Sequence, residues 1–410
     1  MKPLDILISG ASIAGPAAAL LLARQGHRVT VVERASALRD GGQTVDLRGA
    51  GRTVMTRLGL ADAAGARLLQ QRGIATVDAD GRRRSALPVE AFGGNGIVST
   101  HEILRGDLAA VLVEPLPTTV EFLWIDTVVS LDEHRDRVDV TFENAPPRSF
   151  DLVIGADGLG SAVRRAAFGD DAAHLRPIGL RYAWFTAQID AELDGWYLLH
   201  AARGGRVVSA RPSRTGTEVK ASLAVRGVDP VPLVDRESQW RMLEREFADV
   251  GWVAPQLLDR MRTAPDWAYA DLAQVRMERF VTGRIALVGD AGYCPTPLTG
   301  LGTTLALVGA YVLAGELGRS DGNVAGALAG YQEVMRPFVA KAGQLPPGGV
   351  AGYAPRSRAA VALSRFSYWS MNRWPMRPLL TAQFAKADGI DLPAYPAGPV
   401  SAAAPGRVRE

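Results

Sequence analysis

The pattern that most limits how this chain can fold lies in its first 33 residues. Residues 4–9 form a short apolar run typical of a buried strand, and residues 28–33 form a second run of the same kind. Between them, residues 13–25 have the small, apolar composition of a packed helix that ends at Gly26. A strand, a glycine-punctuated turn, a helix and a parallel strand make a βαβ unit. We therefore predict that the chain begins a doubly wound α/β sheet.

The turn between the first strand and the helix has the spacing of a dinucleotide-binding fingerprint, with serine in place of the middle glycine. Gly10 permits the tight turn, Gly15 lets the helix approach the strand, and the first helical N–H groups can bind a pyrophosphate. Glu33 ends the second strand, where it could accept hydrogen bonds from a ribose. The candidate cofactor residues of this unit are Gly10, Ser12, Ile13, Ala14, Gly15, Glu33 and Arg34. From this motif alone, a tight turn in an unrelated α/β protein stays open.

Two later runs, residues 151–155 and 284–289, also have the composition of buried strands, and each leads into a loop that carries an aspartate. Ligands of open α/β sheets bind at such strand ends. Between these two segments, residues 182–225 contain several runs of aromatic and β-branched residues, which are typical of an antiparallel sheet. The sequence therefore predicts an α/β domain that is interrupted by a sheet domain.

The last third of the chain is expected to be mainly helical. Helices are predicted from Gly302 to about residue 318 and over residues 324–342, followed by a break rich in proline and glycine at residues 345–355. Residues 356–387 then form an amphipathic pattern that is interrupted by prolines, and the final fifteen or so residues are expected to fray. Within this stretch, the amphipathic segment from Phe366 to Leu380 is more typical of a packed helix than of a membrane anchor.

Composition excludes several classes of function. The 46 basic and 43 acidic residues are balanced and not clustered into runs, so a nucleic-acid partner is not expected. The single cysteine rules out an internal disulfide, and five scattered histidines show no spacing typical of metal ligands. No apolar run reaches the roughly 18 to 20 residues of a spanning helix. We expect a cytoplasmic protein without a metal site or a membrane partner.

Residues 151–164, with Asp157 and Gly158 at their centre, resemble a signature of the flavoprotein aromatic hydroxylases, the para-hydroxybenzoate hydroxylase family of class A FAD-dependent monooxygenases. Three further segments resemble this family in the same order. The resemblance implies that Arg105 contacts FAD, that Asp290 binds the ribityl chain, and that backbone N–H groups of residues 300–302 face the flavin pyrimidine edge. The further candidate cofactor residues are therefore Arg105, Asp157, Gly158, Gly289, Asp290, Gly300, Leu301 and Gly302.

The chain departs from the family pattern near the flavin ring. Gly292 and Tyr293 stand where members commonly have alanine and histidine, Thr296 replaces the first of two prolines, and Leu301 replaces a glutamine. Backbone contacts survive such changes because any residue except proline supplies an N–H group. The changes therefore affect mainly the side chains that would lie near the flavin ring and the substrate.

The resemblance implies a Rossmann-like FAD-binding domain of the GR2 type, interleaved with an antiparallel-sheet substrate domain and followed by C-terminal helices. We assign residues 1–70, 98–173 and 270–342 to the FAD-binding domain. Residues 71–97 and 174–269 form the substrate domain, and residues 343–410 the C-terminal segment.

The activity implied is monooxygenation. NADPH or NADH would reduce FAD, O2 would form a flavin C4a-hydroperoxide, and this would hydroxylate an aromatic small molecule. Negative charge on the reduced ring would be stabilised by the N-terminus of the helix after Gly302, and no residue is nominated as catalytic. Residues 41–48 also resemble the tetracycline-inactivating flavin monooxygenases, which suggests a polycyclic or phenolic substrate. Candidate substrate residues are Gln43, Arg48, Trp184, Trp196, Tyr197, Arg211 and Pro297.

Alternatives remain open from the sequence. A related reductase would move hydride without oxygenating a substrate, and a flavin halogenase would carry a Trp-x-Trp-x-Ile-Pro segment, which is absent here. A protein that binds FAD and a metabolite without turnover is the alternative from another class. The sequence also leaves open NADPH against NADH, hydroxylation against Baeyer–Villiger insertion, and the oligomeric state.

Overall fold

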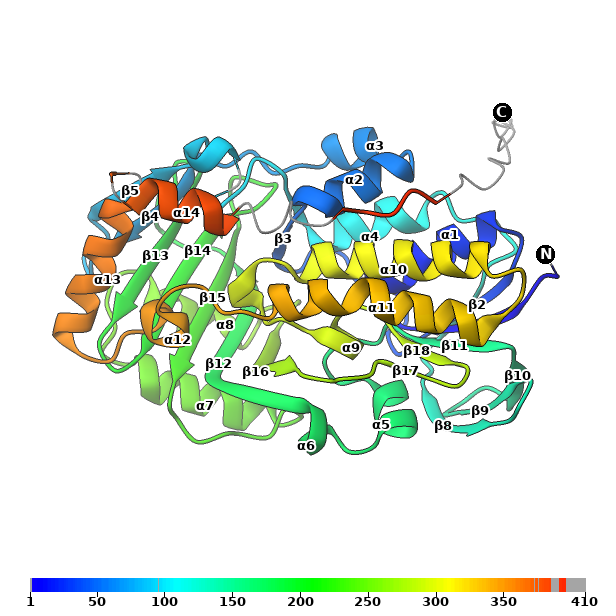
Figure 1. The fold of residues 1–410 in the computed structure, drawn as a ribbon. Helices are drawn as coiled ribbons and strands as arrows, with labels where there is room; N and C mark the ends of the chain where they lie inside the picture. Colours follow the sequence, from blue (N-terminus) through cyan, green and yellow to red (C-terminus); the bar gives the residue numbers. More distant parts are fainter. Residues whose placement is uncertain (1, 95, 372, 375, 385–390, 396–410) are drawn as a thin grey trace, which may run out of the picture.

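The structure is a computed structural model that describes residues 2–94, 96–371, 373–374, 376–384 and 391–395. Two large sheets lie side by side, and helices cover both of them (Figure 1). The predicted fold class is confirmed: an α/β nucleotide-binding fold is interleaved with a second sheet and followed by C-terminal helices. The frayed end predicted for the last residues lies outside the described residues.

The first βαβ unit forms the centre of a six-stranded sheet with the order β17-β18-β11-β1-β2-β7. Its strands are β1 (Asp5–Ser9), β2 (Arg28–Glu33), β7 (Glu121–Trp124), β11 (Leu152–Gly155), β17 (Val281–Thr282) and β18 (Ile285–Leu287). Every pairing is parallel except that of β17 with β18. The carboxyl ends of β1, β2, β11 and β18 therefore meet along one edge, where ligands of such sheets bind.

Helices and a small sheet enclose this six-stranded sheet. Helices α1 (Ala14–Arg24), α2 (Gly49–Arg57), α3 (Ala61–Gly65), α4 (Arg105–Val113), α10 (Gly302–Arg319) and α11 (Val324–Ala342) pack as one group. Helix α5 (Ala162–Phe168) and the three-stranded sheet of β8 (Val128–Glu133), β9 (Val138–Phe142) and β10 (Arg148–Phe150) form another. The buried apolar residues of these elements form one continuous core.

The second sheet has seven strands in the order β16-β12-β15-β14-β13-β4-β5. They are β4 (Gly73–Val77), β5 (Arg83–Pro88), β12 (Leu175–Ala187), β13 (Trp196–Ala202), β14 (Arg206–Pro212), β15 (Val219–Arg226) and β16 (Ala268–Val275). The pairings are antiparallel except that of β13 with β4, which is parallel. This exception arises because β4 enters the sheet from a distant part of the chain.

The two faces of the seven-stranded sheet have different coverings. Helices α7 (Arg236–Phe247) and α8 (Ala254–Met261) pack on one face and bury Ala183 and Phe185. The other face, which includes Tyr182 and Tyr197, packs against residues of α12 (Gly349–Tyr353), α13 (Arg358–Ser370) and α14 (Met376–Phe384). Neighbouring residues of a strand point to opposite faces, so Tyr182 and Ala183 belong to different cores.

A short ribbon joins the two halves of the molecule. Strand β3 (Thr44–Asp46) pairs with β6 (Glu102–Leu104), and Asp46 lies opposite Glu102. The remaining short helices are α6 (Asp171–His174), α9 (Asp290–Tyr293), η1 (Ala91–Gly94) and η2 (Pro297–Thr299). None of the helices in the described part of the chain is long and apolar enough to span a bilayer.

The contact between α1 and the turn after β1 gives a first prediction. A methyl group at Gly15 would lie 1.8 Å from the carbonyl oxygen of Gly10, so Gly15→Ala must push the helix away from the sheet. We expect the free energy of unfolding, measured by urea titration, to fall by about 2 kcal/mol or more. The matched control is Gly65→Ala at the exposed end of α3, where a methyl group meets no atom within 4 Å. Equal effects of the two substitutions would contradict this account.

Candidate cofactor and substrate site

The predicted cofactor segments meet at the carboxyl edge of the six-stranded sheet. Backbone hydrogen bonds join the turns that follow three strands: Gly10 N donates to Val32 O, Ala156 N to Ser9 O, and Val288 N to Gly155 O, at 2.7, 2.7 and 2.8 Å. The turns after β1, β11 and β18 are thereby held together. Segments separated by almost 300 residues of sequence become neighbours, as the strand-end argument predicts.

The glycine turn leaves no room for side chains on its inner side. Gly10 has a φ of 107°, and a methyl group there would lie 2.5 Å from Ala156 O. The next helix, α1, begins after Ile13, and no side chain within the described residues caps its N–H groups. Uncapped N–H groups at a glycine turn suit a phosphate group, because they offer hydrogen bonds and the positive end of the helix dipole.

Glu33 is held facing this turn from the end of β2. One of its carboxylate oxygens accepts a hydrogen bond from Ala11 N at 2.8 Å, and the other accepts one from Ala35 N at 2.9 Å. The side chain is half-buried, whereas the neighbouring Arg34 is exposed. The carboxylate is thus fixed in orientation and still has lone pairs for ribose hydroxyls.

Three predicted residues from different segments form a charged cluster beside the glycine turn: Glu33, Arg105 and Asp290. Arg105, the first residue of α4, donates from Nε to Ser12 Oγ at 2.9 Å. Burial lowers the pKa of Arg105, and the nearby charges of Asp290 and Glu33 oppose that shift. An arginine remains charged in such a site, so its guanidinium could bind a phosphate.

Asp290 lies at the start of α9, on the far side of the same cluster. The surrounding protein raises the pKa of its carboxyl group, and Arg105 partly offsets this. The side chain itself is nevertheless exposed, so it faces solvent within a hollow of the protein rather than a packed core. This arrangement fits a carboxylate that accepts hydrogen bonds from a bound polyol chain.

Asp157 and Gly158 have a different local role. One oxygen of Asp157 accepts hydrogen bonds from Ser9 Oγ at 3.2 Å and from the N–H groups of Ala162 and Val163 at 2.8 and 3.2 Å. Asp157 therefore ties β1 to the first turn of α5. Gly158 has a φ of 78°, which favours glycine at this turn.

The turn after β18 lies close to the start of α1, and the start of α10 lies close to Asp290. A methyl group at Gly289 would lie 3.2 Å from the Ala14 side chain, and one at Gly302 would lie 3.7 Å from Asp290 Oδ1. Gly300 adopts the left-handed conformation, and no side chain among the described residues caps α10. Buried Leu301 replaces the family glutamine without removing the N–H groups that face this space.

Aromatic residues and one arginine form a wall on the seven-stranded sheet. The Tyr182 and Trp184 rings stack at 4.4 Å between centroids, and Tyr353 of α12 donates its hydroxyl to Tyr182 Oη at 3.0 Å. On the same face, the Arg211 guanidinium lies 3.8 Å from the centre of the Tyr197 ring. We call Tyr182, Trp184, Tyr197, Arg211 and Tyr353 the aromatic wall.

The other substrate candidates lie in different places. Trp196 points to the opposite face of the sheet, where it packs in the α7 and α8 core and contacts Arg72 and Arg83. Its strand neighbour Tyr197 takes the wall position, because adjacent side chains alternate. The sequence alone could not show which of the two faces this wall. Pro297 is exposed on η2.

Gln43 and Arg48 flank the β3 strand. The Gln43 carbonyl accepts a hydrogen bond from Arg105 N at 3.0 Å, so this residue helps to position α4. Arg48 is buried, and its Nη2 donates to Asp46 and to the Ile97 carbonyl at 3.0 and 3.2 Å. A methyl group at Gly300 would lie 3.8 Å from the Arg48 guanidinium. Arg48 therefore borders the loop before α10.

Sequence reasoning missed Glu102, which is completely buried beneath the aromatic wall. Arg211 donates from Nη1 to both of its carboxylate oxygens, at 2.9 and 3.0 Å, and Gln71 donates to one of them. Burial raises the pKa of Glu102 to about 7, against the attraction of Arg211 and Arg48 and with the help of Asp46. The negative charge of Glu102 in turn raises the pKa of Arg211, so the guanidinium keeps its charge. Glu102 is therefore the partner that becomes neutral first. A lone glutamate in a short strand gives no sequence signal of such a role.

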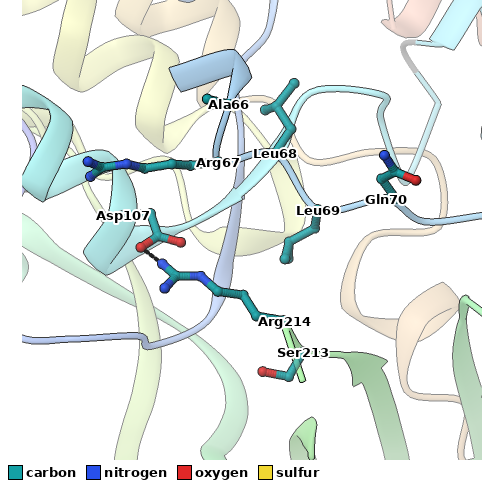
Figure 2. A pocket seen from close by; sticks show the side chains of 8 residues that line it. All are labelled: Ala66, Arg67, Leu68, Leu69, Gln70, Asp107, Ser213 and Arg214. Atoms are coloured by element: carbon teal, nitrogen blue, oxygen red, sulfur yellow. Dashed lines mark ion pairs between the residues drawn. The ribbon is translucent and has the colours of Figure 1, made fainter. Parts of the chain in front are cut away.

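Figure 2 shows a pocket on the other side of α4. It is lined by Ala66, Arg67, Leu68, Leu69, Gln70, Asp107, Ser213 and Arg214, and Arg214 forms an ion pair with Asp107. Asp107 follows Arg105 by two residues, so the two side chains leave the helix in nearly opposite directions. The pocket has no aromatic lining residue, which makes it a poor fit for an aromatic substrate.

Comparison with known proteins gives the family. A model described as FAD binding domain matches residues 3–344. A flavin-dependent monooxygenase of an unknown prokaryotic organism is 39% identical over 338 residues, which cover 82% of this chain and 86% of the relative. The chain belongs to the FAD-dependent monooxygenases of this family. The cofactor is therefore FAD, and the resemblance to the flavoprotein aromatic hydroxylases is confirmed.

Two further likenesses concern this monooxygenase as a whole. An uncharacterized protein of Mycobacterium tuberculosis is 41% identical over 352 residues, 85% of this chain and 94% of the relative. The crystal structure of the tetracycline destructase Tet(55) is 33% identical, with a TM-score of 0.79, and the match covers 96% of this chain and 99% of that one. The resemblance to tetracycline-inactivating enzymes thus extends over nearly the whole chain.

Glu102 gives a prediction for pH dependence. A carboxyl whose pKa is raised on folding binds its proton more tightly in the folded state, so its contribution to stability falls as pH rises from the unfolded pKa through about 7. Glu102→Gln keeps the shape and cannot ionise. We expect wild type to lose stability relative to Glu102→Gln between about pH 5 and pH 8 in urea unfolding. Parallel pH profiles of the two proteins would contradict the raised pKa.

Proposed function

We propose that this monooxygenase uses NADPH or NADH and O2 to hydroxylate an aromatic or polycyclic small molecule that carries an acidic hydroxyl group. The observation that carries the proposal is the aromatic wall, in which three stacked or paired rings stand beside a cation anchored by a buried carboxylate. We place the reaction in the cytoplasm, where nicotinamide cofactors are available and Cys294 stays reduced.

The residues of the cofactor site fit FAD. The glycine turn at Gly10 and Gly15 and the uncapped start of α1 would receive the pyrophosphate, with Arg105 as a counter-charge. Glu33 would bind the adenosine ribose, and Asp290 the ribityl chain. When bound, FAD supplies hydride acceptance and oxygen activation. The uncapped N–H groups at the start of α10 would stabilise negative charge at the edge of the ring.

The substrate side of the proposal rests on Arg211. Its Nη1 is held by Glu102 and by Thr44 Oγ1, while Nε and Nη2 form no hydrogen bond with any residue that the structure describes. These atoms could donate to a phenolate or enolate oxygen, which would favour the ionised, electron-rich form of the substrate. Tyr182, Trp184 and Tyr197 would pack against its rings.

Similarity to Tet(55) supports a polycyclic substrate, because that protein's name states that it destroys tetracycline. Tetracycline-like molecules combine fused rings with acidic enol and phenol oxygens. Both features match the chemistry of the aromatic wall. We therefore place such polyketide-like compounds first among the candidate substrates.

The test is oxygen consumption by the FAD-loaded protein with NADPH or NADH, with and without phenolic and polycyclic compounds that include tetracycline. We expect substrate-dependent oxygen uptake and a product heavier by one oxygen atom, which carries label from ¹⁸O2. Nicotinamide oxidation without oxygen in any product would identify a reductase instead. Tight binding of compounds without turnover would identify a metabolite-binding flavoprotein.

Arg105 gives a separate prediction for the cofactor. Arg105→Met removes the counter-charge proposed for the pyrophosphate but keeps most of the side-chain length. We expect the Kd for FAD, measured by flavin fluorescence titration of the apoprotein, to rise about ten- to a hundredfold. Arg67→Met is the matched control, because Arg67 pairs with Glu114 at the surface. An unchanged Kd in Arg105→Met would remove Arg105 from the proposed site.

A further inference from the structure

The C-terminal helices lie in a segment that is positively charged and contains no acidic residue. Residues 356–387 contain five arginines and one lysine but no aspartate or glutamate. The remainder of the chain has 40 basic and 43 acidic residues, so it is slightly negative. The segment that contains α13 and α14 is therefore positively charged on a chain that is otherwise nearly balanced.

The outer side of this segment is apolar. Eight large apolar side chains are largely exposed in the part of the chain that the structure describes, and four of them lie within twelve residues. These four are Leu363, Phe366, Trp369 and Trp374, with exposed fractions of 67, 59, 46 and 86%. The other four, Ile125, Val129, Leu233 and Val234, contain no aromatic ring. A monomer in water gains nothing from aromatic side chains gathered in this way.

Two of the exposed aromatic rings and one arginine lie against one another. The rings of Phe366 and Trp369 stack at 5.5 Å between centroids, and the Arg373 guanidinium lies 3.9 Å from the centre of the Trp369 ring. Leu363 precedes Phe366 by three residues and shares its side of the helix. We call Leu363, Phe366, Trp369, Arg373 and Trp374 the basic aromatic surface.

The helix that carries this surface is itself well anchored. Ser357 caps α13 by accepting a hydrogen bond from Ala360 N at 3.1 Å, and the helix packs along strand β5. Tyr368 and Met371 point inward, where they pack against the core that contains Tyr182 and Tyr197. Figure 1 shows α13 at the end of the molecule farthest from the N-terminus. Helix α13 thus packs against the protein through one apolar side and exposes a second apolar side to solvent.

We propose that the basic aromatic surface docks onto the surface of an anionic phospholipid bilayer. Exposed tryptophan and phenylalanine beside arginine, on a helix with no acidic residue, match the pattern of helices that lie in a membrane interface. The aromatic rings would enter the headgroup region, while Arg358, Arg373 and Arg377 would pair with lipid phosphates. The segment lies flat on the surface and does not cross the bilayer.

A second copy of this chain fits the surface less well. Two copies that met through this surface would bring their arginines together without any acidic residue of the segment to pair with them. An anionic lipid surface supplies the missing negative charge. Docking would also hold the inner side of α13, next to the aromatic wall, close to a phase in which apolar ring compounds dissolve. Only this last consequence rests on the proposed function.

The test is flotation of the full-length FAD-loaded protein with vesicles. We expect it to float with phosphatidylcholine vesicles that contain roughly one third phosphatidylglycerol, and not with pure phosphatidylcholine. Binding should weaken at about 0.5 M salt, which screens the arginines. Absence of flotation, or equal flotation with both vesicle types, would overturn the proposal.

Matched variants distinguish binding through this surface from nonspecific adsorption of the protein to vesicles. We expect the double substitution Phe366→Ser and Trp369→Ser to reduce the bound fraction about tenfold. Val234→Ser is the control, because Val234 is 94% exposed but lies outside the segment, and it should bind as wild type. Thermal melting checks that both variants fold. If the double variant floats as wild type does, or if it instead dissociates a dimer seen by light scattering, the surface has another role.

Discussion

The close approach of α1 to β1 is the contact on which the rest of the structure depends. Gly15 brings the first turn of the helix against the Gly10 carbonyl, and Gly10 in turn lies against Ala156. These contacts bring the turns after β1 and β11 into register, and the loop at Gly289 then packs against Ala14. Arg105 and Asp290 come near each other, at the cofactor site that we propose, because these backbones are so close. Small residues here thus determine both the core and the site.

The two candidate sites each contain a cluster of charged side chains, and only the cluster around Glu102 is fully buried. Around Arg105, the charges of Asp290 and Glu33 favour the charged guanidinium, for which we propose a phosphate partner. Around Arg211, the buried carboxyl of Glu102 holds Nη1 of the guanidinium, and we propose that the other edge binds the substrate. A buried ion pair contributes little to stability because desolvation offsets the attraction, so the second cluster is better explained by function than by folding.

Much of this arrangement could be predicted from local sequence patterns and from family resemblance. The βαβ unit, the strand-end aspartates and the helix after Gly302 follow from spacing, because each depends on residues close together in the chain. The side to which Trp196 points could not be predicted. Alternation along a strand says that neighbouring side chains point to opposite faces, but it does not say which face each side chain takes. Glu102 could not be found either, because its importance arises from Arg211, which lies 109 residues away.

The order of segments along the chain has a consequence for biosynthesis. Strand β1 leaves the ribosome early, but its partner β11 begins at Leu152, and β18 follows only at Ile285. The edge of β1 stays open until β11 emerges, and the edge of β11 then stays open until β18 emerges. An apolar strand with an open edge can pair wrongly or aggregate. The seven-stranded sheet emerges mostly between these two events. The six-stranded sheet is therefore complete only when about 70% of the chain has been made, and folding during synthesis is expected to depend on chaperones that shield the open strand edges.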